Sequence, residues 1–265
     1  MIKNLFENIR SIIGPLYFII YPKTFGRGYE RYKNNIIKKK IEKKKINIQH
    51  YLDERFIEIP WIIKNLKKLR GNLLDAGSTL NQEYILKKIN YFKKIFIVTL
   101  YPEKNFFNNL NISYIYEDLC DLSLKRSSID VITCISTLEH LNCNNDIYNY
   151  GKFHNSILVK NKIKTVLKNF KDVLKKNGIL LMTVPFGKKG NYHNMEQFNY
   201  SDILKFKKIF KPKNLKIDYY RVQNNKWIKC NYNDCLNIIP NYKLNLNNKK
   251  VALSANSVAL IKMIK

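Results

Sequence analysis

The sequence has few acidic residues: 20 Asp and Glu stand against 48 Lys and Arg, and the formal net charge is +28. One interpretation of this excess is a polyanionic partner such as RNA, DNA or an anionic membrane face. The other is compositional, because Lys, Asn, Ile and Tyr are abundant while Ala, Gly and Arg are scarce, as in a low-GC coding sequence. The lysines are spread over the whole length, which favours composition over a dedicated polyanion site.

Long apolar runs are also missing. The run at residues 12–21 is too short to span a bilayer and is interrupted by Gly14 and Pro15. No small-residue cleavage site follows it, which argues against a signal peptide. We expect this run to dock on the core or to belong to a linker. The alternative is peripheral contact with an anionic membrane, beside the basic residues 38–45. We therefore predict a cytoplasmic protein without a transmembrane segment.

Cysteine is scarce, and its pattern excludes a disulfide framework. The five cysteines are odd in number and form no Cys-x-x-Cys pair, which fits a reducing compartment. Cys230 and Cys235 have no adjacent His and make a poor metal site, so we predict no metal.

Glycine is scarce too, with nine residues in the chain. Residues 72–81 read as a strand, a tight turn around Gly77 and the start of a helix, which is the first unit of a doubly wound α/β fold. Thr79 and Asn81 stand where a three-glycine dinucleotide fingerprint would place its second and third glycines. The turn would lie outside the carboxyl end of the strand, where ligands bind in such folds, and Asp75 could accept hydrogen bonds there.

The remaining pattern predicts one α/β domain over residues 53–265, preceded by a basic, partly apolar extension over residues 1–52. Hydrophobic content of 45% supports a packed core. We expect a helical segment at 53–69, divided where Pro60 starts a second helix. The further expected elements are strands at 95–99, 112–116 and 127–135, a helix at 161–176 ended by Asn177 and Gly178, a strand at 179–184, a helix at 201–210, and strands at 215–220 and 257–264.

Polar and titratable residues follow several of these strands. Glu103 is the first carboxylate after the second strand and a candidate to hold ribose hydroxyls, or else a surface residue. Asp118 could accept a hydrogen bond from an exocyclic amine, and Leu119 could stack on a base. His140, after the fourth strand, could be a general base or could bond to a backbone carbonyl. Substrate contacts are expected in residues 142–160 and 187–200.

The order of elements and four stretches resemble class I S-adenosylmethionine-dependent methyltransferases. Residues 74–78 look like the first motif of that family, and Asp118-Leu119 like its adenine-side motif. Residues 129–140 are similar to its fourth strand, and residues 173–185 to the segment running into and through its fifth. Within that family, the sequence most resembles bacterial type-11-like members, which are often linked to cell-surface polysaccharide loci.

This resemblance implies a mostly parallel, seven-stranded Rossmann-like sheet and S-adenosylmethionine as cofactor. It implies in-line transfer of a methyl group to a small molecule or a sugar or glycan precursor, with His140 and His193 as candidate bases. The resemblance implies that Asp75, Ala76, Gly77 and Ser78 lie near the methionine and ribose end of the cofactor and that Glu103 contacts the ribose. It also implies that Asp118 and Leu119 lie at the adenine, and Ser136 and Thr137 beside the sulfonium.

Three other functions stay open at the level of sequence. An RNA methyltransferase is favoured by charge, although no patch interleaves basic and aromatic residues as single-strand binders do. A catalytically inactive member could bind partners or membrane through residues 1–45. A nicotinamide-dependent oxidoreductase is disfavoured by the missing glycines and by the lack of an acidic residue directly ending the second strand.

Overall fold

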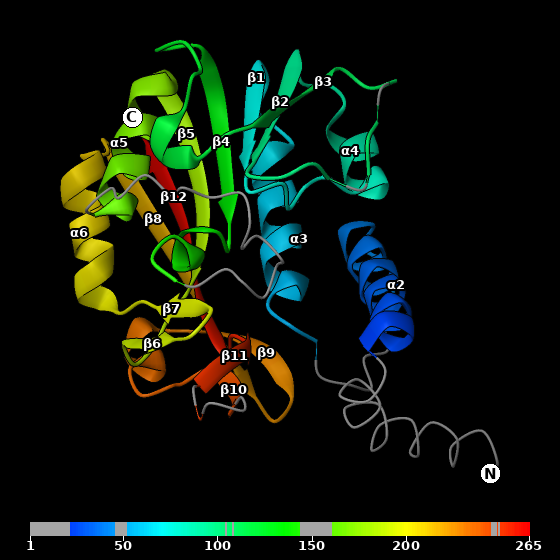
Figure 1. The fold of residues 1–265 in the computed structure, drawn as a ribbon, viewed down its shortest axis with the longest axis vertical. Coiled ribbons are helices and arrows are strands. Elements are labelled where there is room, and N and C mark those ends of the chain that lie inside the picture. Colours follow the sequence, from blue (N-terminus) through cyan, green and yellow to red (C-terminus); the bar gives the residue numbers. More distant parts are fainter. Residues whose placement is uncertain are drawn as a thin grey trace.

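The computed structural model describes residues 22–45, 52–103, 105–107, 109–143, 161–244, 248 and 250–265, with side chains from residue 30 onward (Figure 1). The apolar run at residues 12–21, and all but the first two residues of the expected substrate segment 142–160, lie outside this part of the chain.

The central element is an eight-stranded sheet in the order β3-β2-β1-β4-β5-β12-β8-β9. The first five strands in this order pair in parallel, whereas β12 is antiparallel to both β5 and β8, and β9 is antiparallel to β8. The bounds are β1 Asn72–Ala76, β2 Lys94–Thr99, β3 Ile112–Tyr116, β4 Ile129–Ile135, β5 Leu174–Pro185, β8 Asn214–Gln223, β9 Lys226–Cys230 and β12 Ser257–Ile264. The predicted fold class is confirmed, and β9 is an edge strand beyond the seven that were expected.

Helices cover both faces of the sheet, and each face has its own apolar core. On one face lie α5 (Lys162–Val173) and α6 (Tyr200–Phe210), which bury residues such as Phe170 and Phe206. On the other lie α2 (Pro22–Ile41), α3 (Arg55–Leu66) and α4 (Glu83–Ile89). Successive side chains of β1 point to opposite faces of the sheet, so Leu74 packs in the first core and Leu73 in the second.

Helix α2 lies in the part of the chain expected to be an extension. Its Ile36 and Ile37 are buried in the same cluster as the apolar residues of α3. Lys33 forms ion pairs with Glu30 (2.7 Å) and Asp53 (2.9 Å), which ties the helix to the start of the domain. Residues 30–41 therefore pack on the domain.

Helix α3 runs without a break through Pro60, so the prediction of a second helix beginning there was wrong. Proline has no N–H, and the carbonyl of Phe56 therefore has no partner one turn later in the helix. The ammonium of Lys40 in α2 donates to this carbonyl at 3.0 Å. A side chain from a neighbouring helix thus replaces the missing backbone donor, which sequence periodicity cannot reveal.

The junction between α5 and β5 also differs from the prediction. Helix α5 ends at Val173, and β5 begins at Leu174, which pairs with Ile129. The pairing resumes at Val131 and Ile179, so residues 175–178 bulge opposite Asp130. The ammonium of Lys175 lies 2.8 Å from both carboxylate oxygens of Asp130 and holds this bulge. The Asn-Gly pair therefore lies inside an irregular strand instead of ending a helix.

Two small hairpins lie next to the sheet. Strands β6 (Gly190–Tyr192) and β7 (Met195–Gln197) form one, within the segment expected to be a substrate loop. Strands β10 (Asn241–Leu244) and β11 (Lys250–Ser254) form the other.

Candidate functional site at the carboxyl ends of the parallel strands

The loops after β1 and β4 meet at one edge of the sheet because these strands are parallel neighbours. Gly77 has φ +100°, and a Cβ there would lie 2.3 Å from Oγ1 of Thr137. The N–H of Gly77 donates to the carbonyl of Val98 at 2.9 Å. Only glycine meets both conditions, the left-handed backbone and the contact with Thr137.

Asp75 holds the loop after β1 from inside. It is fully buried, and its two carboxylate oxygens accept from the N–H of Leu80 (2.8 Å) and the hydroxyl of Thr133 (2.9 Å). Burial raises the pKa of Asp75 to about 7, against the hydrogen bonds that favour its charged form. Both oxygens are engaged within the protein, so Asp75 holds the shape of the loop after β1.

Ser78 and Glu103 come together although 25 positions separate them. The Ser78 hydroxyl donates to Oε1 of Glu103, and Ser78 has φ +57°. Among the described residues, no hydrogen bond to Oε2 of Glu103 is present. Glu103 follows β2 later than a ribose-binding carboxylate is expected, yet the chain brings it to the loop beside Gly77.

Ser136 and Thr137 lie in the facing loop. The Thr137 hydroxyl lies 3.1 Å from the carbonyls of both Ala76 and Ile135, so this side chain joins the loops after β1 and β4. Ser136 has φ +42° and is buried, and its hydroxyl donates to Glu58 at 2.6 Å.

Asp118 and Leu119 follow β3, the strand next to β2. Asp118 precedes a short 3-10 helix (Leu119–Asp121) and accepts from the N–H of Cys120 at 2.8 Å. Leu119 is buried in the core cluster that contains α5, and its carbonyl accepts from Asn169. The pair therefore lies at the same sheet edge as Glu103, with Leu119 turned mainly toward the core.

The segments that carry the two candidate bases meet at His140. Nδ1 of His140 lies 2.6 Å from the carbonyl of Asn194, the residue after His193. A carbonyl only accepts, so in the neutral ring Nδ1 carries the hydrogen and Nε2 carries the lone pair. Burial lowers the pKa of His140, which favours this neutral form. The backbone N–H of His193 donates to the carbonyl of Lys250 at 2.8 Å, which joins the β6–β7 hairpin to β11.

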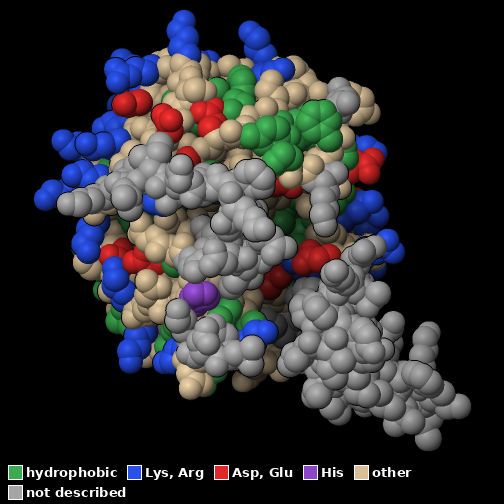
Figure 2. Space-filling model, in the orientation of Figure 1, with side chains coloured by type: hydrophobic (Ala, Val, Ile, Leu, Met, Phe, Trp, Pro, Cys, Tyr) green, Lys and Arg blue, Asp and Glu red, His purple; other side chains and the backbone are tan. Residues whose placement is uncertain are grey.

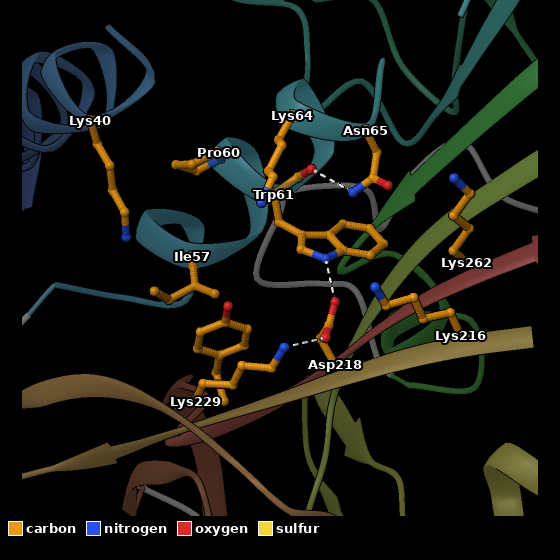
Figure 3. A pocket seen from close by; sticks show the side chains of 11 residues that line it. Lys40, Ile57, Pro60, Trp61, Lys64, Asn65, Lys216, Asp218, Lys229 and Lys262 are labelled. Carbon is orange, nitrogen blue, oxygen red and sulfur yellow. Dashed lines mark hydrogen bonds and ion pairs between the residues drawn. The ribbon is translucent and has the colours of Figure 1, made fainter. Parts of the chain in front are cut away.

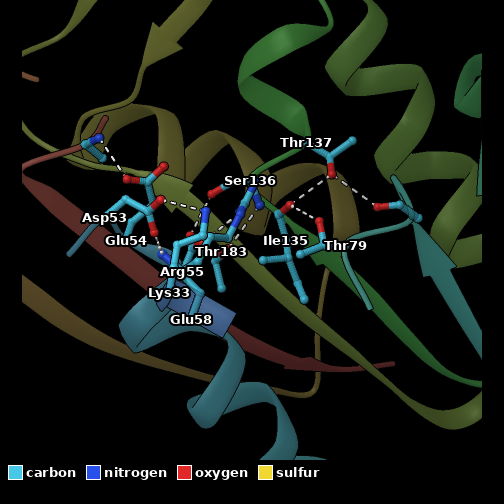
Figure 4. A network of polar contacts seen from close by, with 12 residues as sticks. Lys33, Asp53, Glu54, Arg55, Glu58, Thr79, Ile135, Ser136, Thr137 and Thr183 are labelled. Atoms are coloured by element: carbon cyan, nitrogen blue, oxygen red, sulfur yellow. Dashed lines mark hydrogen bonds and ion pairs between the residues drawn. The ribbon is translucent and has the colours of Figure 1, made fainter. Parts of the chain in front are cut away.

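A buried charged network, which sequence reasoning missed, lies beside Ser136 (Figure 4). Glu58 in α3 is fully buried, and it receives the guanidinium of Arg55 (2.7 Å) and the hydroxyl of Ser136. Glu54 accepts from the N–H of Ala255, and burial raises the pKa of Glu54 to about 7. Glu139 is 1% exposed, its Oε2 has no hydrogen-bond partner among the described residues, and burial raises its pKa well above the ordinary value.

The signal for this network was present in the sequence. Glu58 stands within an otherwise apolar stretch of α3, three residues after Arg55, and such a charge is rarely buried unless it is paired. In the described ranges, no group of three or more His, Cys, Asp or Glu side chains is arranged to hold a metal ion.

Comparison with known proteins gives a match to part of the chain. Residues 98–182 match a family model described as "Methyltransferase domain". The matched stretch covers 85 of the 265 residues. It runs from the end of β2 through β4 into β5, and it includes Glu103, Asp118 and the loop with His140. Comparison with curated protein sequences gave no match.

Solved structures, two of them titled as methyltransferases, align over most of the chain at low identity. The N-methyltransferase NodS from Bradyrhizobium japonicum, solved with S-adenosylhomocysteine, has 12% identity and a TM-score of 0.49, covering 86% of this chain and 98% of its own. The 1,6-didemethyltoxoflavin-N1-methyltransferase from Burkholderia thailandensis has 10% identity and a TM-score of 0.47, covering 98% and 90%. The YcgJ protein from Bacillus subtilis has 12% identity and a TM-score of 0.46, covering 78% and 97%. Likeness at this level says nothing of the substrate.

The described helices include none that is long and apolar enough to cross a membrane.

Proposed function

We propose that the chain is an S-adenosylmethionine-dependent methyltransferase whose acceptor is a small molecule or a sugar or glycan precursor. The supporting observation is the convergence of the loops after β1, β2 and β4 at one sheet edge, where Thr137 joins two of them and Ser78 contacts Glu103. The methyltransferase match over residues 98–182 covers two of these three loops.

The residues at this edge suit the donors that the cofactor offers. Glu103 keeps one carboxylate oxygen for ribose hydroxyls, and Asp118, at the end of the adjacent strand, is an acceptor suited to an exocyclic amine. Ala76, Gly77 and Ser78 would face the methionine and ribose end, while Ser136 and Thr137 would lie beside the reacting centre. When bound, the cofactor supplies an already activated methyl group, so the protein mainly aligns and desolvates the reactants.

A proton must leave the acceptor if its nucleophile is protonated. In the tautomer that the contact with Asn194 favours, Nε2 of His140 carries the lone pair, so His140 is the first candidate base to test. We expect His140→Gln to lower turnover at saturating acceptor and His193→Gln to have a smaller effect. Equal turnover in both variants and the native protein would show that alignment alone suffices.

The acceptor class is tested by methyl transfer from radiolabelled S-adenosylmethionine to fractions of a cell extract. The proposal expects label in the low-molecular-weight and glycan-precursor fractions. Label confined to RNA would support the RNA methyltransferase instead. Absence of transfer, with S-adenosylhomocysteine still bound, would point to an acceptor missing from the extract, whereas absence of both would point to an inactive member.

Contact with an anionic membrane through the basic N-terminal region, and a cytoplasmic location, remain predictions from the sequence. Lys and Arg side chains project from several sides of the molecule (Figure 2), so on this face they form no single basic patch.

A further inference from the structure

A cavity lies on the sheet face that α2 and α3 cover (Figure 3). Its volume is about 390 Å³, within the range of roughly 300–1,000 Å³ that is usual for small-molecule sites. Its walls come from α2, α3, β8, β9 and β12, and none of its lining residues belongs to the loops after β1, β2 or β4. It is therefore separate from the proposed methyl-transfer site.

The lining of this cavity is far more basic than the composition of the chain predicts. Five of its eleven lining residues are lysines and one is acidic, whereas Lys and Arg together make up 48 of 265 residues. Each lysine comes from a different element: Lys40 from α2, Lys64 from α3, Lys216 from β8, Lys229 from β9 and Lys262 from β12. Five independent elements thus bring positive charge to one place.

Two of these lysines form a costly pair. Lys216 and Lys262 lie directly opposite each other in the antiparallel register of β8 and β12, so their side chains share one face of the sheet. Like charges in this arrangement destabilise a sheet. The acidic residue of the cavity, Asp218, is engaged by two other lining residues: it pairs with Lys229 at 2.6 Å and accepts from the indole N–H of Trp61 at 3.0 Å. Across the described ranges, no carboxylate forms an ion pair with Lys64, Lys216 or Lys262.

The cavity also offers ordered apolar surface. The hydrogen bond to Asp218 fixes the indole of Trp61, and the ring of Tyr220 lies on the same strand face as Asp218. Lys40 is held in place by the carbonyl of Phe56 that Pro60 leaves unpaired. Lysines are common point-charge ligands of phosphate, and aromatic rings stack on nucleobases.

We propose that this cavity binds a small anion carrying two or more phosphate groups and a ring that packs on Trp61 and Tyr220, that is, a nucleoside di- or triphosphate. The lysines converge on one cavity instead of forming the continuous basic stripe that suits a nucleic-acid strand. An anion bound between Lys216 and Lys262 would attract both ammonium groups and offset their mutual repulsion.

The test is a titration of the full chain with a fluorescent trinitrophenyl derivative of ATP, competed by ATP, inorganic triphosphate and a single-stranded RNA oligonucleotide. The double variant Lys216→Gln/Lys262→Gln is compared with Lys207→Gln/Lys208→Gln, which removes two exposed charges from α6. About tenfold loss per removed charged contact predicts about a hundredfold weaker binding for the first pair and no change for the second.

A second variant distinguishes loss of binding from loss of folding. Lys262→Glu replaces the like-charge pair with an opposite-charge pair, so it should melt no lower than the native protein and still lose binding. S-adenosylhomocysteine binding should be unchanged in every variant. Equal weakening by both double variants, no competition by ATP, or stronger competition by RNA than by ATP at equal phosphate concentration would each overturn the proposal.

Discussion

Asp75 provides a prediction whose magnitude follows from the structure. Its ordinary pKa is 3.8 and burial raises it to about 7. Between these values the unfolded chain releases a proton that the folded chain keeps, so the protein loses stability as the pH rises from 4 to 7. The full loss is on the order of 4 kcal/mol, of which about 2–3 kcal/mol falls between pH 5 and pH 8.

Asp75→Asn should remove this loss while keeping the contacts. The amide oxygen can accept from the N–H of Leu80, and the amide nitrogen can donate to the hydroxyl of Thr133. That hydroxyl can then donate to the carbonyl of Leu74, which already lies 3.3 Å away. At pH 8 the variant should be at least as stable as the native protein. Asp75→Ala instead leaves the buried N–H of Leu80 unpaired, at a cost of about 1–3 kcal/mol.

Urea unfolding at pH 5 and pH 8 measures these differences. The control is Asp121→Asn, because Asp121 is exposed and its loss should leave the native pH dependence intact. Parallel pH profiles for the native protein and Asp75→Asn would refute the raised pKa. A loss above about 2 kcal/mol for Asp75→Asn at pH 8 would show that the loop needs the negative charge itself.

Three other perturbations have defined outcomes. Glu58→Ala leaves Arg55 without its buried partner and should cost about 3 kcal/mol in urea unfolding, whereas a cost near zero would mean that solvent replaces the pair. Lys40→Met should lower the free energy of unfolding by about 1–2 kcal/mol because the carbonyl of Phe56 loses its donor. Adding Pro60→Ala restores a backbone donor and should recover most of that loss. If the stability changes of the two substitutions simply add, this explanation is contradicted. Because burial lowers the pKa of His140, initial methyl-transfer rates should not change with pH above pH 7 and should fall only below the ordinary pKa of 6.5. A fall in rate already at pH 7.5 would exclude neutral His140 as the base.

The sheet and most of its helices could be predicted because local apolar patterns determine them. Strand β3 falls at the predicted residues 112–116, and β2 and β12 fall within one residue of the predicted bounds. The predicted element boundaries were wrong where contacts with residues distant in the sequence determine them. Lys40 supplies the donor that lets α3 continue through Pro60, and the pairing of Leu174 with Ile129 starts β5 early.

In the candidate site, too, local features could be predicted and long-range contacts could not. The loop around Gly77 is recognisable in the sequence because a left-handed turn after a buried strand calls for glycine. The contact of Ser78 with Glu103, and the network of Glu58 with Ser136, join residues 25 and 78 positions apart. No local pattern encodes such pairings.

The most direct test of the proposed function is titration calorimetry of the native protein with S-adenosylmethionine and S-adenosylhomocysteine, with NADH as control. Glu103→Gln should weaken binding, while Glu83→Gln, at an exposed position in α4, should not. We predict micromolar binding of both cofactor forms and none of NADH. Absence of binding by either form, from a protein that unfolds cooperatively, would contradict the methyltransferase function.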